Sequence, residues 1–400
     1  MEGPVEASNE TAAAANWPPA IANWFAFENG EPWLAAHEYP LFTDAWITGE
    51  ITLGPYTFMN TVAVSNSSDV IKPAVILRYG VYKKSPFPDF RKTTAELHHG
   101  GSPPEEVAAL SSLIMAMRLR AGRTTRRFEP NLDPRGKPVE IGEQELPYFQ
   151  KPRTYKLPHI AMGPHSLMDL TKLQTLAKIS VTEAIAIVRS ARLYQDAMWL
   201  AEPEPELAWL LLVSAIETAA NEWQKGNGEN IARLKCSKPK LYKYLDSIED
   251  RSVLSTVADN LVDSLGITKK FKDFLITFLP DPPSARPAKW AQFNWEEKEL
   301  KRAFVKIYGY RSKALHEGRP FPLPMCSPGF QEPGWDAPAE RMIANATSQN
   351  ANVWLHKDVP MNLHLFEYIA RNALLIWWDS CAARDESAKG FIREEANLRQ

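Results

Sequence analysis

Hydrophobic residues in the second half of the chain recur mostly at three- and four-residue steps, the spacing of one face of an α-helix. The clearest run extends from Trp295 to Leu315, where no proline interrupts the pattern, and Gly318 and Pro320 then end it. The same periodicity predicts further helices over residues 167–177, 181–199, 204–224, 238–245 and 253–265. We therefore expect a helical second half.

Residues 45–82 follow another pattern. Runs of β-branched and aromatic residues alternate there with Gly, Pro, Asn and Ser, which predicts three or more strands, over 46–53, 56–64 and 73–82. Pro103 then opens a predicted helix that has two glutamates near its N-terminus, where carboxylates complement the helix dipole. We expect this helix to pack on the sheet.

The two patterns divide the chain and predict an α+β fold. Residues 1–40 are rich in Ala, Pro, Asn and Trp and are predicted to form an irregular arm. Residues 41–165 form a predicted β-rich domain, which ends in a long connection with many prolines and glycines. Residues 166–400 form a predicted all-helical domain with a loop-rich insertion at 319–360. A chain of 400 residues favours two domains, because one hydrophobic core rarely organises so many residues.

The charge and cysteine content limit the functional classes. The chain has 46 Lys and Arg against 48 Asp and Glu, so it is not a generally basic nucleic-acid coat protein, and any RNA contact must be local. The three cysteines, Cys236, Cys326 and Cys381, are far apart and suggest neither a zinc cluster nor a disulfide framework. A reducing cytoplasm is the expected location.

The termini and apolar runs indicate a soluble protein without a membrane partner. The N-terminal residues lack the basic start and apolar run of a signal peptide. The longest apolar runs, 207–215 and 373–378, are shorter than the roughly 20 residues that a membrane-spanning helix needs.

Several common catalytic motifs are missing from the sequence. It contains no phosphate-binding P-loop, no G-x-G-x-x-G after a predicted strand and no G-x-S-x-G. His316 and Glu317 begin like the zinc motif H-E-x-x-H, but Pro320 stands at the position of the second histidine. We expect neither a metal site nor a cofactor.

Arg311 and His316 are the leading candidates for chemistry. A guanidinium can hold a phosphate through two parallel hydrogen bonds, and an imidazole can transfer a proton near neutral pH, which together suit metal-free phosphodiester cleavage. Arg311 lies within the predicted helix that ends near Gly318. Two other pairs have a similar spacing, but prolines near them predict loops: Arg91 with His98, and Arg153 with His159.

Three segments resemble the HEPN superfamily, in particular its ApeA-like branch. Residues 307–318, with the R-x4-H spacing, resemble the family signature, and 210–219 resemble an apolar helix with an embedded glutamate. Residues 365–378 resemble the closing helix, so the resemblance covers about residues 190–385. It implies an all-helical homodimer that brings two R-x4-H motifs together across a two-fold axis and often cleaves RNA without a metal. Some members of the superfamily are binding or scaffold modules instead.

The expected reaction is transesterification by the ribose 2′-OH. His316 would act as the base or acid, and Arg311 would stabilise the charge that develops on the phosphoryl oxygens. Residues five apart on a helix differ in direction by about 140°, so one motif does not converge by itself, whereas two motifs in a symmetric dimer supply a base, an acid and two guanidiniums.

Two further residues are predicted to support this pair. Ser312 lies on the same helix face as His316 and is expected to bond the imidazole or a phosphate, or alternatively a helix carbonyl. Glu217 lies in an apolar helix and needs a partner if it is buried, either Arg311 or a backbone donor. A purely structural role is the alternative for Arg311 and His316. As cations near a helix C-terminus, they would complement the helix dipole.

A second basic cluster lies in the β-rich half. It comprises Arg118, Arg120, Arg123, Arg126 and Arg127. These arginines are predicted either to contact RNA phosphates or to form a solvated helix end.

Two functional classes remain open. The first is a metal-independent endoribonuclease of a phage-defence or toxin system, which cuts tRNA or mRNA and whose N-terminal domain senses a trigger or a regulatory partner. The second is a non-catalytic HEPN module that binds RNA, a nucleotide or a protein. An enzyme needs the titrating imidazole of His316, whereas a binding module tolerates glutamine there.

Overall fold

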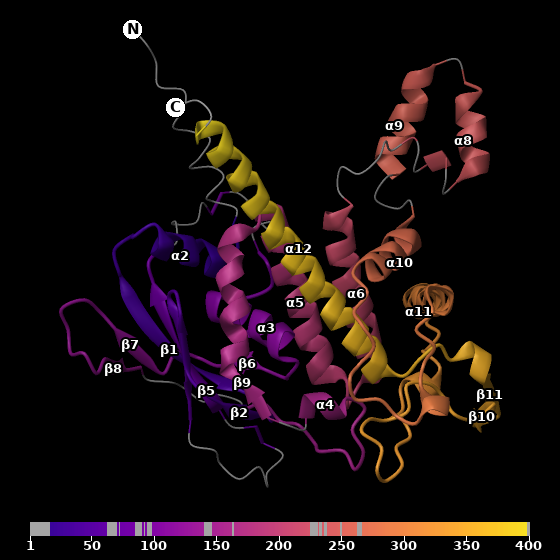
Figure 1. The fold of residues 1–400 in the computed structure, drawn as a ribbon, viewed down its shortest axis with the longest axis horizontal. Coiled ribbons are helices and arrows are strands. Elements are labelled where there is room, and N and C mark those ends of the chain that lie inside the picture. Colours follow the sequence, from indigo (N-terminus) through magenta and orange to yellow (C-terminus); the bar gives the residue numbers. More distant parts are fainter. Residues whose placement is uncertain are drawn as a thin grey trace.

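An antiparallel sheet lies on the N-terminal side of the molecule, and long helices lie on the other side (Figure 1). The computed structural model describes residues 17–61, 70–71, 73–84, 90–91, 93, 98–139, 146–161, 164–224, 231, 234–235, 238–248, 250–261 and 266–397. This mixture of helices and antiparallel strands confirms the predicted α+β class.

The strands of this sheet follow the order β3–β4–β5–β1–β7–β8, with β6 paired to β1. Their bounds are β1 Ala35–Phe42, β3 Ile51–Leu53, β4 Tyr56–Asn60, β5 Pro73–Val81, β6 Arg120–Ala121, β7 Arg126–Phe128 and β8 Lys137–Pro138. The predicted strand 46–53 is divided, because Gly49 adopts a positive φ of 80° between β2 (Trp46–Thr48) and β3. Of the predicted strand 56–64, residues 62–64 lie outside the described residues.

The prediction of an irregular arm over residues 1–40 is wrong for residues 17–40, which contain a helix and the start of a strand. Helix α2 (Pro19–Glu28) begins with proline at its first position, where the missing N–H costs nothing, and Trp24 is buried. Strand β1 then pairs with β5 from Ala35 onward. This strand was not predicted, because polar residues and proline argue against a central strand and it contains His37, Glu38 and Pro40. Residues 1–16 lie outside the described residues.

Helix α3 (Pro103–Met115) confirms the helix predicted at Pro103. Ser102 and Glu105 form a capping box at its N-terminus, and Ala116 ends it in a left-handed conformation with φ 51°. Its buried face belongs to the same hydrophobic cluster as the inner face of the sheet, so it packs on the sheet as expected.

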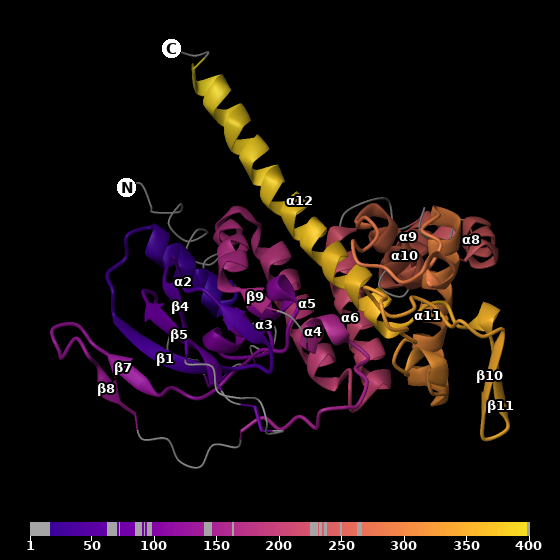
Figure 2. The same ribbon diagram turned by 60° about the horizontal axis from the view of Figure 1, so that its bottom comes forward.

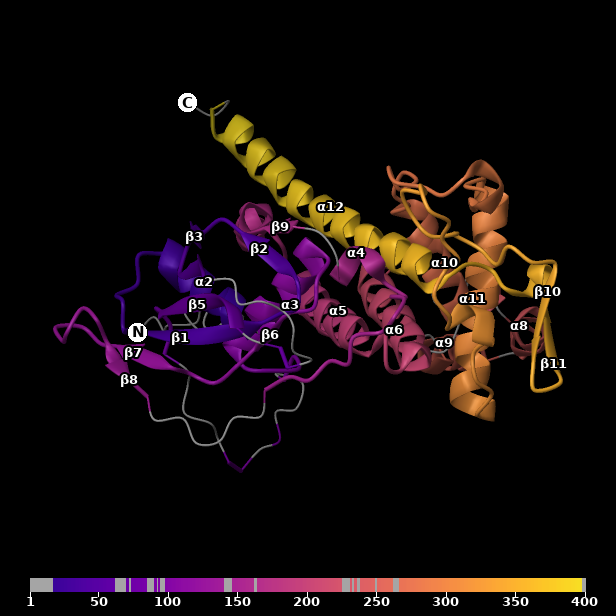
Figure 3. The same ribbon diagram turned by 90° about the horizontal axis from the view of Figure 1, so that it is seen from below.

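Most helices of the second half agree with the periodicity, but α10 was not predicted and α12 extends well beyond the residues 365–378 that were predicted for it. They are α5 Val181–Leu200, α6 Pro205–Trp223, α8 Pro239–Asp246, α9 Arg251–Leu261, α10 Ile267–Thr277, α11 Glu297–Glu317 and α12 Leu363–Asn397. The segment predicted at 167–177 is a 3-10 helix, η2 (Leu167–Lys178). Residues 262–265, predicted to end a helix, lie outside the described residues. Helix α12 runs past α5 and α6, and α11 lies on the side of α6 that faces away from the sheet (Figures 2 and 3).

The second half is not entirely helical. Strands β10 (Ala346–Gln349) and β11 (Asn352–Leu355) form a hairpin in the insertion, which we expected to be loop. Asn350 and Ala351 occupy its turn with positive φ. The hairpin lies next to α11 (Figure 3), and the segment after it contacts that helix, because the Tyr310 hydroxyl donates to the Asp358 carbonyl at 2.7 Å.

The two predicted domains share one hydrophobic core. Buried residues of the sheet, α3, α5, α6, α11 and α12 form one continuous cluster. Arg371 on α12 donates hydrogen bonds to the carbonyls of Leu113 and Ile114 at the end of α3. A parallel pairing of β2 with β9 (Pro164–Ser166) reaches the predicted boundary, where Thr48 pairs with Ser166. The boundary therefore marks a change of secondary structure rather than a gap between two cores.

Among the described residues, no helix has both the length and the apolar composition needed to cross a membrane.

Candidate functional site on helix α11

Helix α11 has one buried face and one open face. Leu300, Phe304 and Ile307 recur at helical steps and are fully buried in the core. The helix ends at Gly318, whose φ of 64° is strained for any residue with a Cβ. Its backbone N–H donates to the Lys313 carbonyl, so the backbone itself caps the C-terminus.

Arg311 lies toward the buried face, where it pairs with α6. Its Nη2 atom is 2.7 Å from Oε2 of Glu217, and the two side chains are 19% and 12% exposed. The Tyr308 hydroxyl donates to the other carboxylate oxygen of Glu217 at 2.8 Å. The sequence left Arg311 and a backbone donor open as the partner of Glu217, and the structure shows Arg311, together with the Tyr308 hydroxyl. Both oxygens of Glu217 thus accept hydrogen bonds from α11.

Tyr308 remains protonated in this arrangement. Burial raises the pKa of its phenol well above the ordinary value of 10, and the hydrogen bond to the Glu217 carboxylate raises it further. The phenol is therefore a hydrogen-bond donor throughout the neutral range, and it holds Glu217 in position for Arg311.

His316 lies on the opposite, open side of α11. Five residues separate it from Arg311, a turn of about 140° around the helix axis. The imidazole is exposed and makes no hydrogen bond or ion pair within the described part of the chain. A single chain therefore does not bring the two motif residues together. Ser312 is half-buried, and the structure records no hydrogen bond of its hydroxyl with the described residues.

The open face of α11 is a cationic stripe. Its members are Arg302, Lys306, Lys313 and His316, and at about 100° per residue all of them point within about 40° of one direction. Gly309 lies in the middle of the stripe, and a Cβ built there would meet no atom within 4 Å. The stripe is therefore open at Gly309, whereas Lys306 is half-buried and donates to the Lys357 carbonyl.

A groove of about 780 Å³ continues from the N-terminal half of this stripe. It is enclosed by α11, α10 and the segment before α12, and its charged lining residues are Lys272, Glu299, Lys301, Arg302, Lys306, Arg341 and Lys357. Six of these seven are basic. Three of the six have a carboxylate neighbour: Arg302 pairs with Glu299 at 2.6 Å, Lys272 lies 3.5 Å from Asp273, and Lys301 pairs with Glu297. Arg341 donates to the Trp290 carbonyl, which does not compensate its charge. The groove is therefore positively charged.

The basic cluster of the β-rich half is not one surface. Arg118 is fully buried, donates to Asp44 from Nε at 3.0 Å and lies 4.2 Å from the ring centroid of Phe149. It cannot reach an RNA strand, so the prediction of RNA contact is wrong for Arg118. The sequence contained a signal for this burial, because Arg118 lies between the hydrophobic residues Met117 and Leu119, and both of these are buried.

The remaining arginines of this cluster are dispersed over strands and turns rather than a helix end. Three of them have acidic neighbours: Arg120 lies 3.6 Å from Asp196, Arg126 lies 3.9 Å from Glu38, and Arg127 lies 2.8 Å from Glu129. Arg123 is exposed between β6 and β7. The interpretation as a solvated helix end is therefore wrong, because α3 already ends at Met115.

The cationic groove was missed by sequence reasoning. Lys272, Arg341 and Lys357 come from an adjacent helix and a loop, and their side chains meet α11 only in the folded chain. The sequence signal lay in α11 itself, where Arg302, Lys306 and Lys313 follow the helical period on the face opposite the apolar residues.

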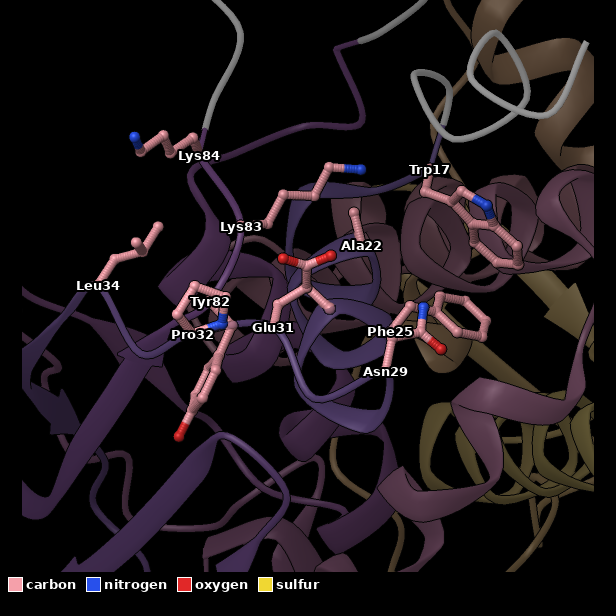
Figure 4. A pocket seen from close by; sticks show the side chains of 11 residues that line it. Trp17, Ala22, Phe25, Asn29, Glu31, Pro32, Leu34, Tyr82, Lys83 and Lys84 are labelled. Atoms are coloured by element: carbon pink, nitrogen blue, oxygen red, sulfur yellow. The ribbon is translucent and has the colours of Figure 1, made fainter. Parts of the chain in front are cut away.

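Another hollow, of about 720 Å³, lies beside α2, far from α11 (Figures 1 and 4). Trp17 and Phe25 form one wall, and Figure 4 shows Tyr82 pointing away from them. Its charged side chains are Glu31, Lys83 and Lys84, and no His, Cys, Ser or Thr is among its described lining residues, so it offers no evident catalytic set.

Neither metal ligands nor reactive thiols gather near α11. Within the described residues no three His, Cys, Asp or Glu side chains lie close enough to hold a metal ion. Burial raises the pKa of the Cys326 and Cys381 thiols to about 12, so both stay protonated. Cys236 lies outside the described residues.

No family model matches the sequence, and neither a search of curated proteins nor a search of solved structures found a match.

Proposed function

We propose that the open face of α11 binds the phosphate backbone of RNA and that the protein is a metal-independent endoribonuclease. The cationic stripe that includes His316 is the observation that supports this proposal most strongly. Lys and Arg side chains at successive turns suit a chain of phosphates, because each neutralised phosphate releases a condensed counterion. An exposed imidazole at the end of such a stripe is placed to exchange a proton with a ribose hydroxyl.

The proposed chemistry follows from the residue types. His316 removes the proton of the 2′-OH, the resulting oxygen attacks the adjacent phosphorus, and the 5′-oxygen leaves with a proton from a second acid. General acid–base catalysis of this kind contributes about 10²- to 10⁴-fold. Only one hydrogen bond of the Arg311 guanidinium, from Nη2 to Glu217, is recorded within the described residues, and Nε is buried, so the proposed contact to a phosphoryl oxygen uses the remaining Nη N–H groups.

A second copy of the chain completes this proposed site. His316 and Arg311 of one chain point in directions about 140° apart, so the second imidazole and a facing guanidinium would come from a partner across a two-fold axis. The open stripe and Gly309, which has free space above it, permit such an approach. We propose tRNA or mRNA as the substrate and a reducing cytoplasm as the location.

The second candidate is a non-catalytic module that binds RNA, a nucleotide or a protein. The Arg311–Glu217 pair favours it, because an arginine bound to a carboxylate already has a structural role. As part of the enzymatic proposal, we propose that the protein acts in phage defence or as a toxin. Residues 41–165 would then respond to a trigger or a regulatory partner.

Incubation of the purified chain with total tRNA and with a labelled single-stranded RNA in EDTA tests the proposal. We expect cleavage that leaves 2′,3′-cyclic phosphate ends and disappears in both His316→Ala and His316→Gln. His98→Ala, which removes another exposed imidazole, serves as the control and should retain activity. Cleavage that is unchanged in the His316 variants would exclude this residue as the catalyst, and RNA binding without cleavage in any sample would favour the binding module.

A further inference from the structure

Three aromatic side chains gather on the surface near the start of α11. Trp290 lies on a short 3-10 helix, η3 (Lys289–Ala291), and the other two, Phe330 and Trp335, lie in the insertion. The ring centroids of Trp290 and Trp335 are 5.3 Å apart with the ring planes at 74°. Those of Phe330 and Trp335 are 5.8 Å apart with the planes at 83°. These three residues form the aromatic cluster.

The aromatic cluster is largely open to solvent. Trp290 is 54% exposed and Phe330 is 46% exposed, while Trp335 is half-buried and contacts both. Single exposed hydrophobic residues are common on protein surfaces, but a contiguous group of large ones marks a binding surface. Tryptophan and phenylalanine have only two rotatable side-chain bonds, so their rings lose little entropy when a ligand covers them.

A buried carboxylate joins the two segments that carry the cluster. Glu340 is 2% exposed, and it accepts two hydrogen bonds from the Arg286 guanidinium, at 2.7 and 2.6 Å. It also accepts from the backbone N–H of Phe293 at 2.6 Å, and its own N–H donates to the Ala291 carbonyl at 3.1 Å. These contacts hold the segments together without the aromatic rings. The rings are therefore positioned before a ligand arrives.

Arg341 connects the aromatic cluster to the cationic groove. Its Nη2 atom donates to the Trp290 carbonyl at 2.8 Å, and the same side chain lines the groove. Phe293, three residues after Trp290, is half-buried and also lines the groove. The cluster therefore lies at the edge of a groove whose charged residues are mostly basic.

The charges around the cluster favour one placement of a nucleotide chain. Lys289 is exposed next to Trp290, and Arg341 contacts the Trp290 backbone. Two exposed carboxylates, Glu332 and Asp336, lie in the same loop as the other two rings. These carboxylates repel phosphates, whereas the two cations and the groove attract them. A bound chain would therefore have its phosphates toward the groove and its bases toward the rings.

We propose that the aromatic cluster is a base-binding subsite, on which unpaired bases of an RNA strand stack while the neighbouring phosphates lie in the cationic groove. This inference rests on the RNA binding proposed for α11. Sites for single-stranded nucleic acids combine a basic groove with aromatic rings, and every base offers a π-face, so the subsite accepts any of the four bases. Bases within a duplex are already stacked on one another. The subsite therefore selects unpaired segments of an RNA.

Fluorescence anisotropy with two labelled ligands of equal length and charge tests this proposal. One is a single-stranded RNA, and the other is an abasic chain, which has the phosphates but no bases. Trp290→Ala should weaken RNA binding by at least about 10-fold and change binding of the abasic chain by less than about 2-fold. Trp290→Phe retains an aromatic face and should weaken RNA binding less. The matched control, Trp46→Ala, removes a tryptophan that is 63% exposed on β2, and it should bind both ligands like the wild-type chain.

The outcomes separate failure of the subsite from failure of the RNA site on α11. Circular dichroism verifies that each variant is folded, and if Trp290→Ala is not, Phe330→Ala replaces it. Normal RNA binding by the folded variants would overturn the subsite, and so would equal weakening for RNA and the abasic chain. If Lys306→Glu with Lys313→Glu then still weakens binding, the RNA site on α11 stands without the subsite. A wild-type chain that binds neither ligand would overturn both proposals.

Discussion

Arg311 on α11 and Glu217 on α6 form a partly buried ion pair, with 2.7 Å between Nη2 and Oε2. Removal of one partner leaves a desolvated charge behind. We predict that Arg311→Ala lowers the free energy of unfolding by about 3 kcal/mol, near the lower end of values for buried pairs because both groups keep some exposure. Urea unfolding followed by circular dichroism measures this loss.

Two companion variants distinguish the ion pair from simple truncation of a helical side chain. Arg311→Lys retains the charge but loses the planar guanidinium, and it should fall between wild type and alanine. Lys313→Ala removes an exposed cation from the same helix and should change the stability by less than about 0.5 kcal/mol. Equal effects of Arg311→Ala and Lys313→Ala would contradict a structural role for the pair.

Arg118 and Arg123 provide a second comparison. Arg118→Ala removes the partner of Asp44 and the contact with the Phe149 ring, so we predict a loss of about 3 to 5 kcal/mol in the free energy of unfolding. Arg123→Ala, on the exposed turn between two strands, should leave it unchanged within about 0.5 kcal/mol. If Arg118→Ala were as stable as Arg123→Ala, the burial assigned to Arg118 would be wrong.

Glu106 makes the stability of the fold depend on pH. Burial raises its pKa from an ordinary 4.5 to about 8 in the folded chain, although the Ala20 N–H and the charge of Arg192 oppose this. The folded state thus binds the proton more tightly than the unfolded state. Its contribution to stability is complete below pH 4.5 and is lost as pH rises to about 8, at up to about 1.4 kcal/mol per pH unit.

Urea unfolding between pH 5 and about 8 checks this dependence. Glu106→Gln cannot ionise and keeps an oxygen for the Ala20 N–H, so we expect it to lose less stability than the wild-type chain as pH rises. The exposed Glu31→Gln serves as the control and should follow the wild-type curve. Parallel curves for all three proteins would show that Glu106 is not protonated in the folded state.

The periodic helices were predictable because their signal is local. Pro205 and Gly318 mark helix ends through backbone effects that need no tertiary contact. The helical spacing of Leu300, Phe304 and Ile307 indicates one buried face. The pairing of Glu217 with Arg311 was also predictable, since a glutamate in an apolar helix requires a partner.

The other features depend on contacts between distant segments. Strand β1 contains His37, Glu38 and Pro40 and is recognised as a strand only through its pairing with β5 and β7. His159 and Glu367 are separated by 208 residues and by a fold boundary that the sequence suggested. No local pattern connects them, so this contact between their side chains could not be predicted from the chain alone.

Binding of a labelled single-stranded RNA, measured by fluorescence anisotropy over a range of salt concentrations, tests the proposed role of α11 most directly. The test variant is Lys306→Glu with Lys313→Glu on the stripe, and the matched control is Lys240→Glu with Lys243→Glu on the exposed face of α8. Both variants change the net charge equally. We predict that the stripe variant binds at least 10-fold more weakly, with a salt dependence smaller by about two counterions, while the control resembles wild type. Equal affinity of wild type and the stripe variant, or equal weakening in both variants, would contradict an RNA site on α11.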